Sequence, residues 1–341
     1  MRAAVVRGRG RVEIAHLPVP EPGPGEARVR VGACGICGSD LHLFANGLFP
    51  PAQTPGHESA GWVDALGDGA TGPPIGAKVA VEPMRSCGSC PSCGAGRYSI
   101  CRESRLAGLH DPGGLAEYQL VPAERLHRVP EDLAAPVAAL AEPMAVVTRA
   151  LRRGALAPGQ RVLVLGAGAV GLLAASAARA LGAGEVWISA RHPHQAARAR
   201  ALGVARVFDE AEATHAALDA MGREAPIDLV VETVGGRADT VEAAAAAVRP
   251  GGAVAVVGVF WDRLALDPMP LLLKEVTLAW SYCYGSDGGR SDFAEAITVL
   301  AAQRAALAPL VTHAASLDDV AKAFTDAADK RGGAVKVSVV P

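Results

Sequence analysis

The chain has 341 residues. This is too many for a single ordinary hydrophobic core and enough for two domains. Its formal net charge is −2 and its arginines are scattered, so the composition argues against a nucleic-acid partner. Arginines interrupt the apolar N-terminal run, which is unlike a secretory signal. The longest uncharged stretch, residues 162–178, is rich in Gly and Ala, which argues against a membrane span. With an odd count of seven cysteines, these features predict a cytoplasmic protein.

The first 140 or so residues contain short apolar runs that Gly and Pro separate. Runs of this length and punctuation are typical of β-strands joined by turns. They predict a small β-barrel-like domain, with strands near residues 3–6, 27–33, 60–67, 77–83 and 116–122.

Four cysteines within this part form a C-x2-C-x2-C-x7-C pattern: Cys87, Cys90, Cys93 and Cys101. Four thiolates in one loop can close a tetrahedral zinc site. Disulfides and an iron–sulfur cluster are the alternatives, but in clustered ferredoxin cysteines the fourth follows after three residues, whereas here the gap is seven. We predict a structural zinc ion, and a closed site of this kind has no open position for catalysis.

After Pro143 the pattern changes to compact apolar runs that alternate with Ala-rich amphipathic stretches. The runs cover residues 161–166, 185–190, 228–235 and 253–260. Such an alternation predicts a parallel sheet covered by helices on both faces. From about Gly285 two helices, 291–303 and 316–330, precede a last strand, and we expect this tail to pack on the first domain.

The run from Arg161 to Ala183 reads as strand, glycine loop and helix. The loop has the pattern G-x-G-x-x-G. Its glycines are Gly166, Gly168 and Gly171, and the intervening residues are Ala167, Ala169 and Val170. In this context the first glycine permits a tight turn, the second lets a pyrophosphate approach, and the third lets the helix pack closely on the strand. The sequence therefore predicts a dinucleotide site, against the alternative of a purely structural glycine turn.

The next strand ends at Ala190, where a fold that prefers NAD places an acidic residue on the ribose hydroxyls. Arg191 follows and offers a forked donor to a 2′-phosphate. This favours NADP over NAD. The alternative is that Arg191 is an ordinary solvated residue at the start of a helix.

A catalytic metal needs about three ligands outside the four-cysteine loop and one open position. The candidates are Cys37, His57, Glu58 and Glu142. Each has an ordinary structural alternative when taken singly, since a cysteine after a strand is usually buried and Glu142 could be a surface charge. Together, beside a predicted dinucleotide fold, they indicate a second metal site.

Five motifs occur in this order: GICGSDLH at 35–42, GHE at 56–58, the four-cysteine loop, LAEP at 140–143 and GAGAVG at 166–171. With them the whole chain resembles the zinc-dependent medium-chain alcohol dehydrogenases, and its tail resembles the polyol and threonine dehydrogenase branch. The resemblance implies an α/β protein with a GroES-like β-rich catalytic domain formed by residues 1–142 and 285–341. A Rossmann domain, a doubly wound parallel sheet, would span 143–284, with the active site in the cleft between the two domains.

The resemblance also implies roles for single residues. Cys37, His57 and Glu58 would bind the catalytic zinc, and Glu142 would bind it directly or through its water. Which glutamate binds in the resting state is left open. Asp40 would accept a hydrogen bond from His57 and fix its tautomer.

In the same way Ser39 would contact the substrate hydroxyl, and His42 would end a proton relay that passes through the nicotinamide ribose. Gly258 and Val259 would receive the carboxamide of the nicotinamide. The resemblance thus implies hydride transfer between a zinc-held alcohol, secondary or polyol-like, and NAD(P), with two zinc ions per chain. Sorbitol dehydrogenases usually have Arg-Tyr where this chain has Ser281-Tyr282, which argues against a sugar alcohol. We expect a homo-oligomer, a dimer or tetramer.

Two other functions fit parts of this pattern. Reduction of an activated C=C or C=N bond occurs in related zinc reductases with altered relays, but Ser39 and His42 are both present. A nonenzymatic nucleotide-binding or structural relative would have lost its zinc ligands, whereas Cys37, His57 and Glu58 are present. The alcohol dehydrogenase is therefore the favoured prediction.

Overall fold

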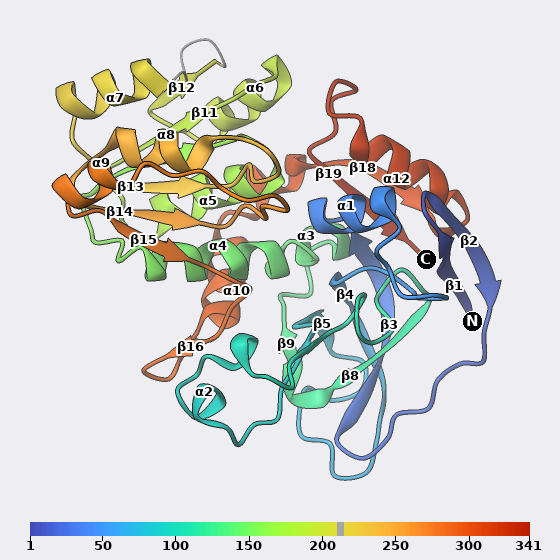
Figure 1. Ribbon diagram of the computed structural model, residues 1–341. Coiled ribbons are helices and arrows are strands. Elements are labelled where there is room, and N and C mark those ends of the chain that lie inside the picture. The colour runs from blue at the N-terminus through green and yellow to red at the C-terminus, as the bar shows by residue number, and fades with distance from the viewer. Residues whose placement is uncertain (210–214) are drawn as a thin grey trace. The chain divides into compact units, whose positions relative to one another are not determined.

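The computed structural model describes residues 1–209 and 215–341 (Figure 1). The chain divides into two units, one of Met1–Glu142 with Gly285–Pro341 and the other of Pro143–Tyr284. Together they form a mixed α/β protein, as the sequence predicts.

The first unit, all of whose residues are described, is built on a seven-stranded sheet in the order β18-β19-β3-β4-β5-β9, with β8 also paired to β3. The last strand pairs antiparallel with β3, so the C-terminal tail joins the same sheet as the N-terminal segment. The strands are β3 (Glu26–Gly35), β4 (Glu58–Leu66), β5 (Lys78–Val81), β8 (Tyr118–Pro122), β9 (Leu126–Arg128), β18 (Val311–Ser316) and β19 (Lys336–Val340).

Three two-stranded pairs complete the β-structure described in this unit: β1 (Arg2–Gly8) with β2 (Arg11–His16), β6 (Met84–Arg85) with β7 (Arg105–Leu106), and β16 (Ser286–Asp287) with β17 (Arg290–Ser291). Its α-helices are α1 (Gly38–Asn46), α2 (Pro91–Gly94), α3 (Ala135–Ala138), α10 (Asp292–Ala302), α11 (Arg304–Leu307) and α12 (Val320–Ala328). Its 3-10 turns are η1 (Tyr98–Ile100), η2 (Ala123–Arg125), η3 (Ala308–Leu310) and η4 (Leu317–Asp319). Phe324 of α12 packs in one buried cluster with Val337 and Val339 of β19, which holds the tail on the sheet.

In the second unit the described residues form a six-stranded parallel sheet in the order β12-β11-β10-β13-β14-β15. In chain order this is 3-2-1-4-5-6, the arrangement of a doubly wound dinucleotide fold. The strands are β10 (Arg161–Leu165), β11 (Glu185–Ser189), β12 (Arg206–Phe208), β13 (Ile227–Glu232), β14 (Val248–Val256) and β15 (Thr277–Trp280). The sequence pattern predicts β10, β11, β13 and β14, but it does not predict the two edge strands.

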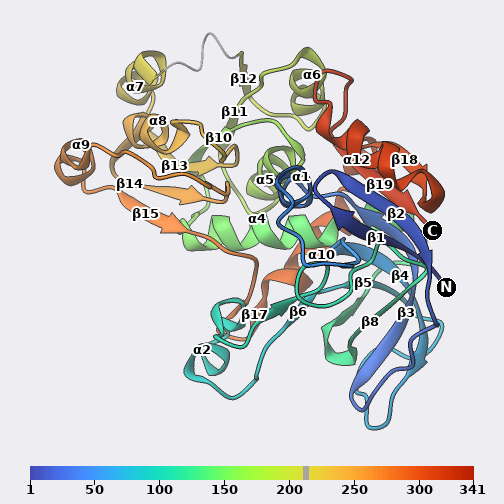
Figure 2. The same ribbon diagram turned by 45° about the vertical axis from the view of Figure 1, so that its right-hand side comes forward.

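Helices cover both faces of this sheet, and Figures 1 and 2 show α8 on one side of β13 and β14 and α4 on the other. Leu163 and Leu165 of β10 belong to the core beneath α7 and α8, whereas the alternate residues Val162 and Val164 are equally buried and lie outside that cluster. Both faces of β10 are therefore covered, as in parallel sheets generally. The helices are α4 (Ala141–Arg153), α5 (Ala169–Ala180), α6 (Pro193–Ala201), α7 (His215–Glu224), α8 (Thr240–Ala247) and α9 (Pro268–Leu273).

Among the described residues no single helix combines the length and the apolar composition needed to cross a membrane. One pair, Asp292–Ala302 with Arg304–Leu310, meets the two criteria only when taken together, and it is bent by 87°.

Candidate metal centres and cofactor site

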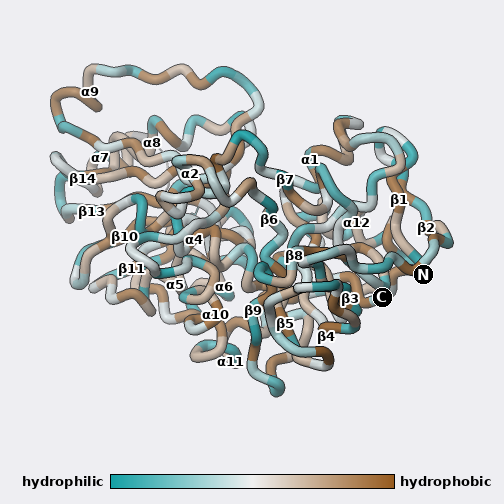
Figure 3. Tube along the Cα trace, turned by 90° about the horizontal axis from the view of Figure 1, so that it is seen from below, coloured by the Kyte–Doolittle hydropathy of each residue, from teal (hydrophilic) through white to brown (hydrophobic). Residues whose placement is uncertain are grey.

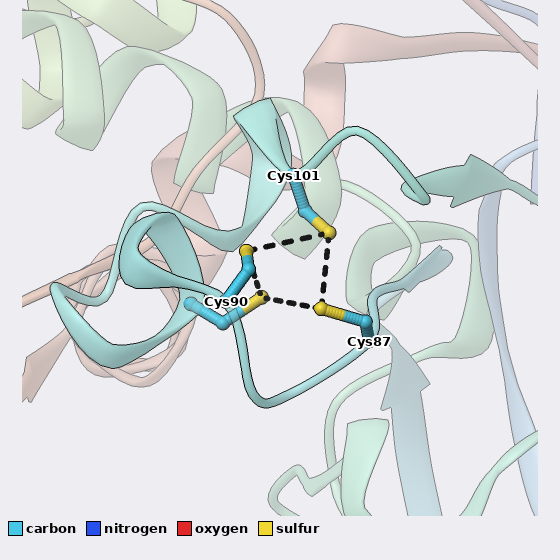
Figure 4. Close-up of side chains that lie close together, drawn as sticks. Cys87, Cys90 and Cys101 are labelled. Carbon is cyan, nitrogen blue, oxygen red and sulfur yellow. Dashed lines mark hydrogen bonds between the residues drawn. The ribbon is translucent and has the colours of Figure 1, made fainter.

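The four cysteine sulfurs of residues 87–101 face one another (Figure 4). Neighbouring Sγ atoms lie 3.5 to 3.9 Å apart, and all four cysteines are free thiols. A tetrahedron with Zn–S bonds of about 2.3 Å has sulfurs about 3.8 Å apart. A disulfide needs about 2.05 Å. The loop therefore fits one tetrahedral metal ion and no disulfide.

The electrostatics of the loop also suit a cation. Backbone N–H groups of Ser89 and Cys90 point at the sulfur of Cys87 and lower its thiol pKa to about 6. The thiolate is the form that binds metal. The loop is fixed to the sheet by Tyr98, whose ring lies 4.2 Å below the guanidinium of Arg125, itself paired at 2.7 Å with the buried carboxylate of Glu82. This arrangement fits a structural role.

A second cluster in the first unit brings together Cys37, His57 and Glu58, whose ligand atoms all lie within 4.8 Å of one another. Cys37 is the N-cap of α1, two residues after the end of β3. Glu58 is the first residue of β4, and His57 directly precedes it. Because β3 and β4 pair antiparallel, the end of one strand lies beside the beginning of the other. One thiol, one imidazole and one carboxylate form a donor set that suits zinc.

Asp40 supports two members of this cluster. Its Oδ2 accepts a hydrogen bond from the backbone N–H of Cys37 at 3.0 Å, and its Oδ1 lies 3.4 Å from Nδ1 of His57. Contact with Nδ1 leaves Nε2 of the imidazole available to a metal. Burial opposes a charged His57, but the negative charges of Asp40 and Cys37 outweigh it and raise the pKa well above its usual value. The surroundings thus favour a positive charge at this place.

Lys336 of β19, which the sequence analysis does not identify, is also part of the site. Its Nζ lies 2.7 and 2.6 Å from the two carboxylate oxygens of Glu58, and both side chains are buried. Burial lowers the pKa of Lys336, but the opposite effect of the charge of Glu58 helps to outweigh burial, so the pKa of the lysine lies above its usual value. A lysine at the start of a last strand that is otherwise mostly valine is the sequence signal that could have identified it. This ion pair fixes the carboxylate of Glu58.

Glu142, at the start of α4, is buried but lies outside the set within 4.8 Å. Burial raises the pKa of its carboxyl to about 7, with a smaller opposite contribution from His57. The charge of Glu58 also acts on it, which places Glu142 near the cluster. Ser39 and His42 are three positions apart on α1 and partly buried, so both lie on one helix face next to Cys37.

The glycine loop of the second unit joins β10 to α5. Gly166 has a φ of 96°, and Gly168 is the exposed N-cap of α5, whose first turn contains Ala169 and Val170. A Cβ at Gly171 would lie 1.7 Å from the carbonyl oxygen of Gly166, so only glycine permits this approach of helix to strand. Free N–H groups at the N-terminus of α5 are the feature that binds a pyrophosphate.

The other residues predicted to contact the cofactor follow β11 and β14, two further strands of the same parallel sheet. Arg191 is exposed and comes two residues after β11, directly after the buried Ala190. Gly258 and Val259 follow β14, and the carbonyl of Val259 accepts a hydrogen bond from Gly236 N at 2.8 Å. The carboxyl ends of parallel strands are where doubly wound folds bind ligands.

Comparison with known proteins agrees with this geometry. Residues 23–131 match the family described as "Alcohol dehydrogenase GroES-like domain", and residues 169–302 match "Zinc-binding dehydrogenase". Sorbitol dehydrogenase of Bacillus subtilis is 32% identical over 350 residues, which covers 100% of this chain and 97% of that protein. The chain belongs to the zinc-dependent medium-chain alcohol dehydrogenase family. The predicted family is thus confirmed.

Solved structures of family members resemble this chain over its whole length. Galactitol-1-phosphate dehydrogenase of Escherichia coli has a TM-score of 0.92 and 32% identity, with 100% of each chain covered. A putative zinc-binding dehydrogenase of Sinorhizobium meliloti 1021 bound to NADP has a TM-score of 0.89 and 31% identity, covering 100% of this chain and 99% of that one. This member of the medium-chain alcohol dehydrogenase family is accordingly a zinc-dependent, NAD(P)-linked oxidoreductase that acts on CH–OH groups.

Proposed function

We propose that this dehydrogenase interconverts a secondary, polyol-like alcohol and its ketone, with NADP as the favoured cofactor. The observation that carries the proposal is the cluster of Cys37, His57 and Glu58, which supplies three zinc-type ligands and leaves a fourth position for substrate. The similarity to sorbitol and galactitol-1-phosphate dehydrogenases supports the substrate class. The first unit would supply the catalytic zinc site, and the second would bind the cofactor.

Each residue of the site has a distinct role in the proposed reaction. Zinc, when bound, supplies Lewis acidity at the alcohol oxygen, and NAD(P) supplies the hydride acceptor. Ser39 would accept the proton of the substrate hydroxyl and release its own hydroxyl proton into the relay, which His42 would end by passing a proton to solvent. Asp40 holds the imidazole of His57 in the tautomer that leaves Nε2 for the metal. Of the two glutamates, we propose Glu58 as the resting ligand, because Glu142 lies outside the set of close ligand atoms.

Cys87, Cys90, Cys93 and Cys101 would hold a second zinc ion with a purely structural role, which gives two zinc ions per chain. Their sulfur spacing and the lowered thiol pKa of Cys87 support this assignment.

Steady-state kinetics with secondary alcohols, polyols and primary alcohols, each with NAD and NADP, test the proposed function. We expect kcat/KM to be higher for secondary alcohols and polyols than for primary alcohols, and roughly tenfold to hundredfold higher with NADP than with NAD. The reason is that Ala190 removes a repelling carboxylate and that charge-assisted hydrogen bonds from Arg191 to the 2′-phosphate contribute about 1.5 to 3 kcal/mol.

Variants at the end of β11 sharpen this test. Arg191→Ala should remove most of the preference by raising KM for NADP alone, and combination with Ala190→Asp should reverse it. Arg200→Ala, on the exposed side of α6 in the same unit, is the matched control and should leave the ratio unchanged. A wild-type preference for NAD would refute the cofactor assignment, and no turnover of any alcohol with either cofactor would refute the proposed activity.

We further propose that the protein forms a homo-oligomer. Among the described residues β15 pairs only with β14, so its outer edge is open. The neighbouring α9, largely brown in Figure 3, exposes Leu272 and Leu273 at 70% and 75%. An open sheet edge can pair with a strand of another chain, and adjacent exposed apolar side chains often mark a protein interface. Sedimentation analysis should give a dimer or tetramer, and a species of 34.7 kDa at micromolar concentration would contradict the proposal.

A further inference from the structure

Glu232, the last residue of β13, has a completely buried side chain in the second unit. Its Oε1 accepts three hydrogen bonds, from Val234 N at 2.7 Å, Gly235 N at 2.9 Å and the hydroxyl of Thr240 at 2.7 Å. One carboxylate oxygen therefore folds the segment after β13 back on itself and ties it to the beginning of α8.

The second oxygen of the same carboxylate has no partner among the described residues. It faces Gly258, where an added Cβ would lie 2.3 Å from Oε2. A buried, unpaired carboxylate oxygen costs free energy, so packing alone does not account for this residue. Its position beneath Gly258 connects it to the loop after β14.

Thr233, the next residue, contacts the glycine loop that follows β10. Its hydroxyl lies 2.7 Å from the carbonyl of Leu165 and 3.1 Å from that of Gly166, and its backbone N–H also donates to Leu165. In addition, a Cβ on Gly166 would lie 2.7 Å from a methyl group of Val234. The segment after β13 thus fixes the first glycine of the dinucleotide loop.

These contacts lie at the place in the sheet where the strand order reverses. β10 and β13 are neighbours in the sheet, although β11 and β12 separate them in sequence, and this is the point where the strand order reverses. Dinucleotides bind at that switch point in doubly wound folds. The bond from Gly236 N to the carbonyl of Val259, at 2.8 Å, extends the connection to the end of β14.

We propose that Glu232 and Thr233 are positioning residues for the nicotinamide cofactor. Glu232 shapes residues 233–236, and through this segment Gly166 on one side and Gly258 with Val259 on the other are held at the spacing that the cofactor requires. The inference rests on the proposed cofactor role of the second unit. The pyrophosphate and the nicotinamide are common to both cofactors. A loss of this spacing should therefore weaken the binding of NAD and of NADP equally.

The test uses the purified full-length protein and calorimetric titration with NADP and with NAD. Thr233→Val removes the hydroxyl at nearly constant shape and should raise both dissociation constants about tenfold, the scale of one lost hydrogen bond. Thr233→Ser keeps the hydroxyl and should stay within about twofold of wild type. Glu232→Gln should also raise both constants about tenfold, with the NADP-to-NAD ratio unchanged.

Asp228→Asn is the matched control on the same strand. Asp228 stands near the other end of β13, where it accepts hydrogen bonds from Arg161 N at 2.8 Å and Arg249 Nε at 2.7 Å. This variant should lower the melting temperature and leave cofactor binding unchanged. If it weakens binding as much as Thr233→Val does, the effect is general destabilisation and the proposal is wrong.

The other possible results also support or refute the proposal. Wild-type affinity in both Thr233→Val and Glu232→Gln overturns the inference, and if Glu232→Gln does not fold, the two Thr233 variants decide alone. A wild-type protein that binds neither cofactor refutes the proposed function instead.

Discussion

Replacement of Cys37 by serine should lower turnover by at least about a thousandfold and leave a folded protein that binds cofactor with wild-type affinity. The variant loses one of three ligand atoms that lie within 4.8 Å of one another, and with it the ion that stabilises charge on the substrate oxygen. A loss of about 4 kcal/mol of that stabilisation corresponds to this factor. Because β3, β4 and β19 are joined by their own hydrogen bonds, the sheet does not depend on this ligand.

Cys93→Ser provides the contrast. The four-cysteine loop contains little helix or strand. A metal ion bound there would therefore contribute directly to the folding free energy. This variant should lower the melting temperature strongly. Cys34→Ala, a buried thiol of β3 outside both clusters, is the control and should retain both zinc ions. Zinc content, melting temperature and kcat are measured for all three. Equal melting temperatures of the Cys37 and Cys93 variants, with equal loss of activity, would contradict the division of roles.

Ser39→Ala should lower kcat by roughly a hundredfold or more, which is the contribution of a positioned proton transfer. The side chain lies on the first turn of α1, two residues from Cys37, where it is partly buried. His42→Ala, three positions further along the helix, should have a smaller effect because water can replace a terminal proton carrier. Neither variant should change the affinity for cofactor.

The measurement is kcat under conditions where the chemical step limits the rate, confirmed by a deuterium isotope effect on the transferred hydride. Ser39→Thr retains a hydroxyl and should recover most of the activity lost in Ser39→Ala. If Ser39→Ala turns over alcohol at the wild-type rate, the serine does not accept the substrate proton.

The four-cysteine loop and the glycine loop could be predicted from sequence because their residues are neighbours in the chain. When ligands lie within one loop, their spacing limits the geometries that they can reach, and the structure shows the four sulfurs facing one another. The glycine pattern of residues 166–171 similarly specifies a strand, a turn and a helix in immediate succession. The cytoplasmic location, also expected from sequence, remains a prediction that cell fractionation would test.

Short edge strands were harder to predict. β12 has three residues and β15 has four, too few for a periodic pattern to be distinguished from a loop. They become strands because the registers of β11 and β14 offer unpaired backbone groups to them. Their structure is therefore a consequence of the sheet that precedes them.

By itself the sequence determined the two-domain α/β class, the family, the four-cysteine cluster and the glycine loop, since each follows from local spacing or a run of motifs. Only the tertiary structure decided which residues distant in sequence support the reactive cluster and the glycine loop. Lys336 meets Glu58 across 278 residues of sequence, and Thr233 meets Leu165 across 68. Such partners are brought together by strand pairing and strand order, which burial of the apolar faces determines. No local pattern encodes the distance between their atoms.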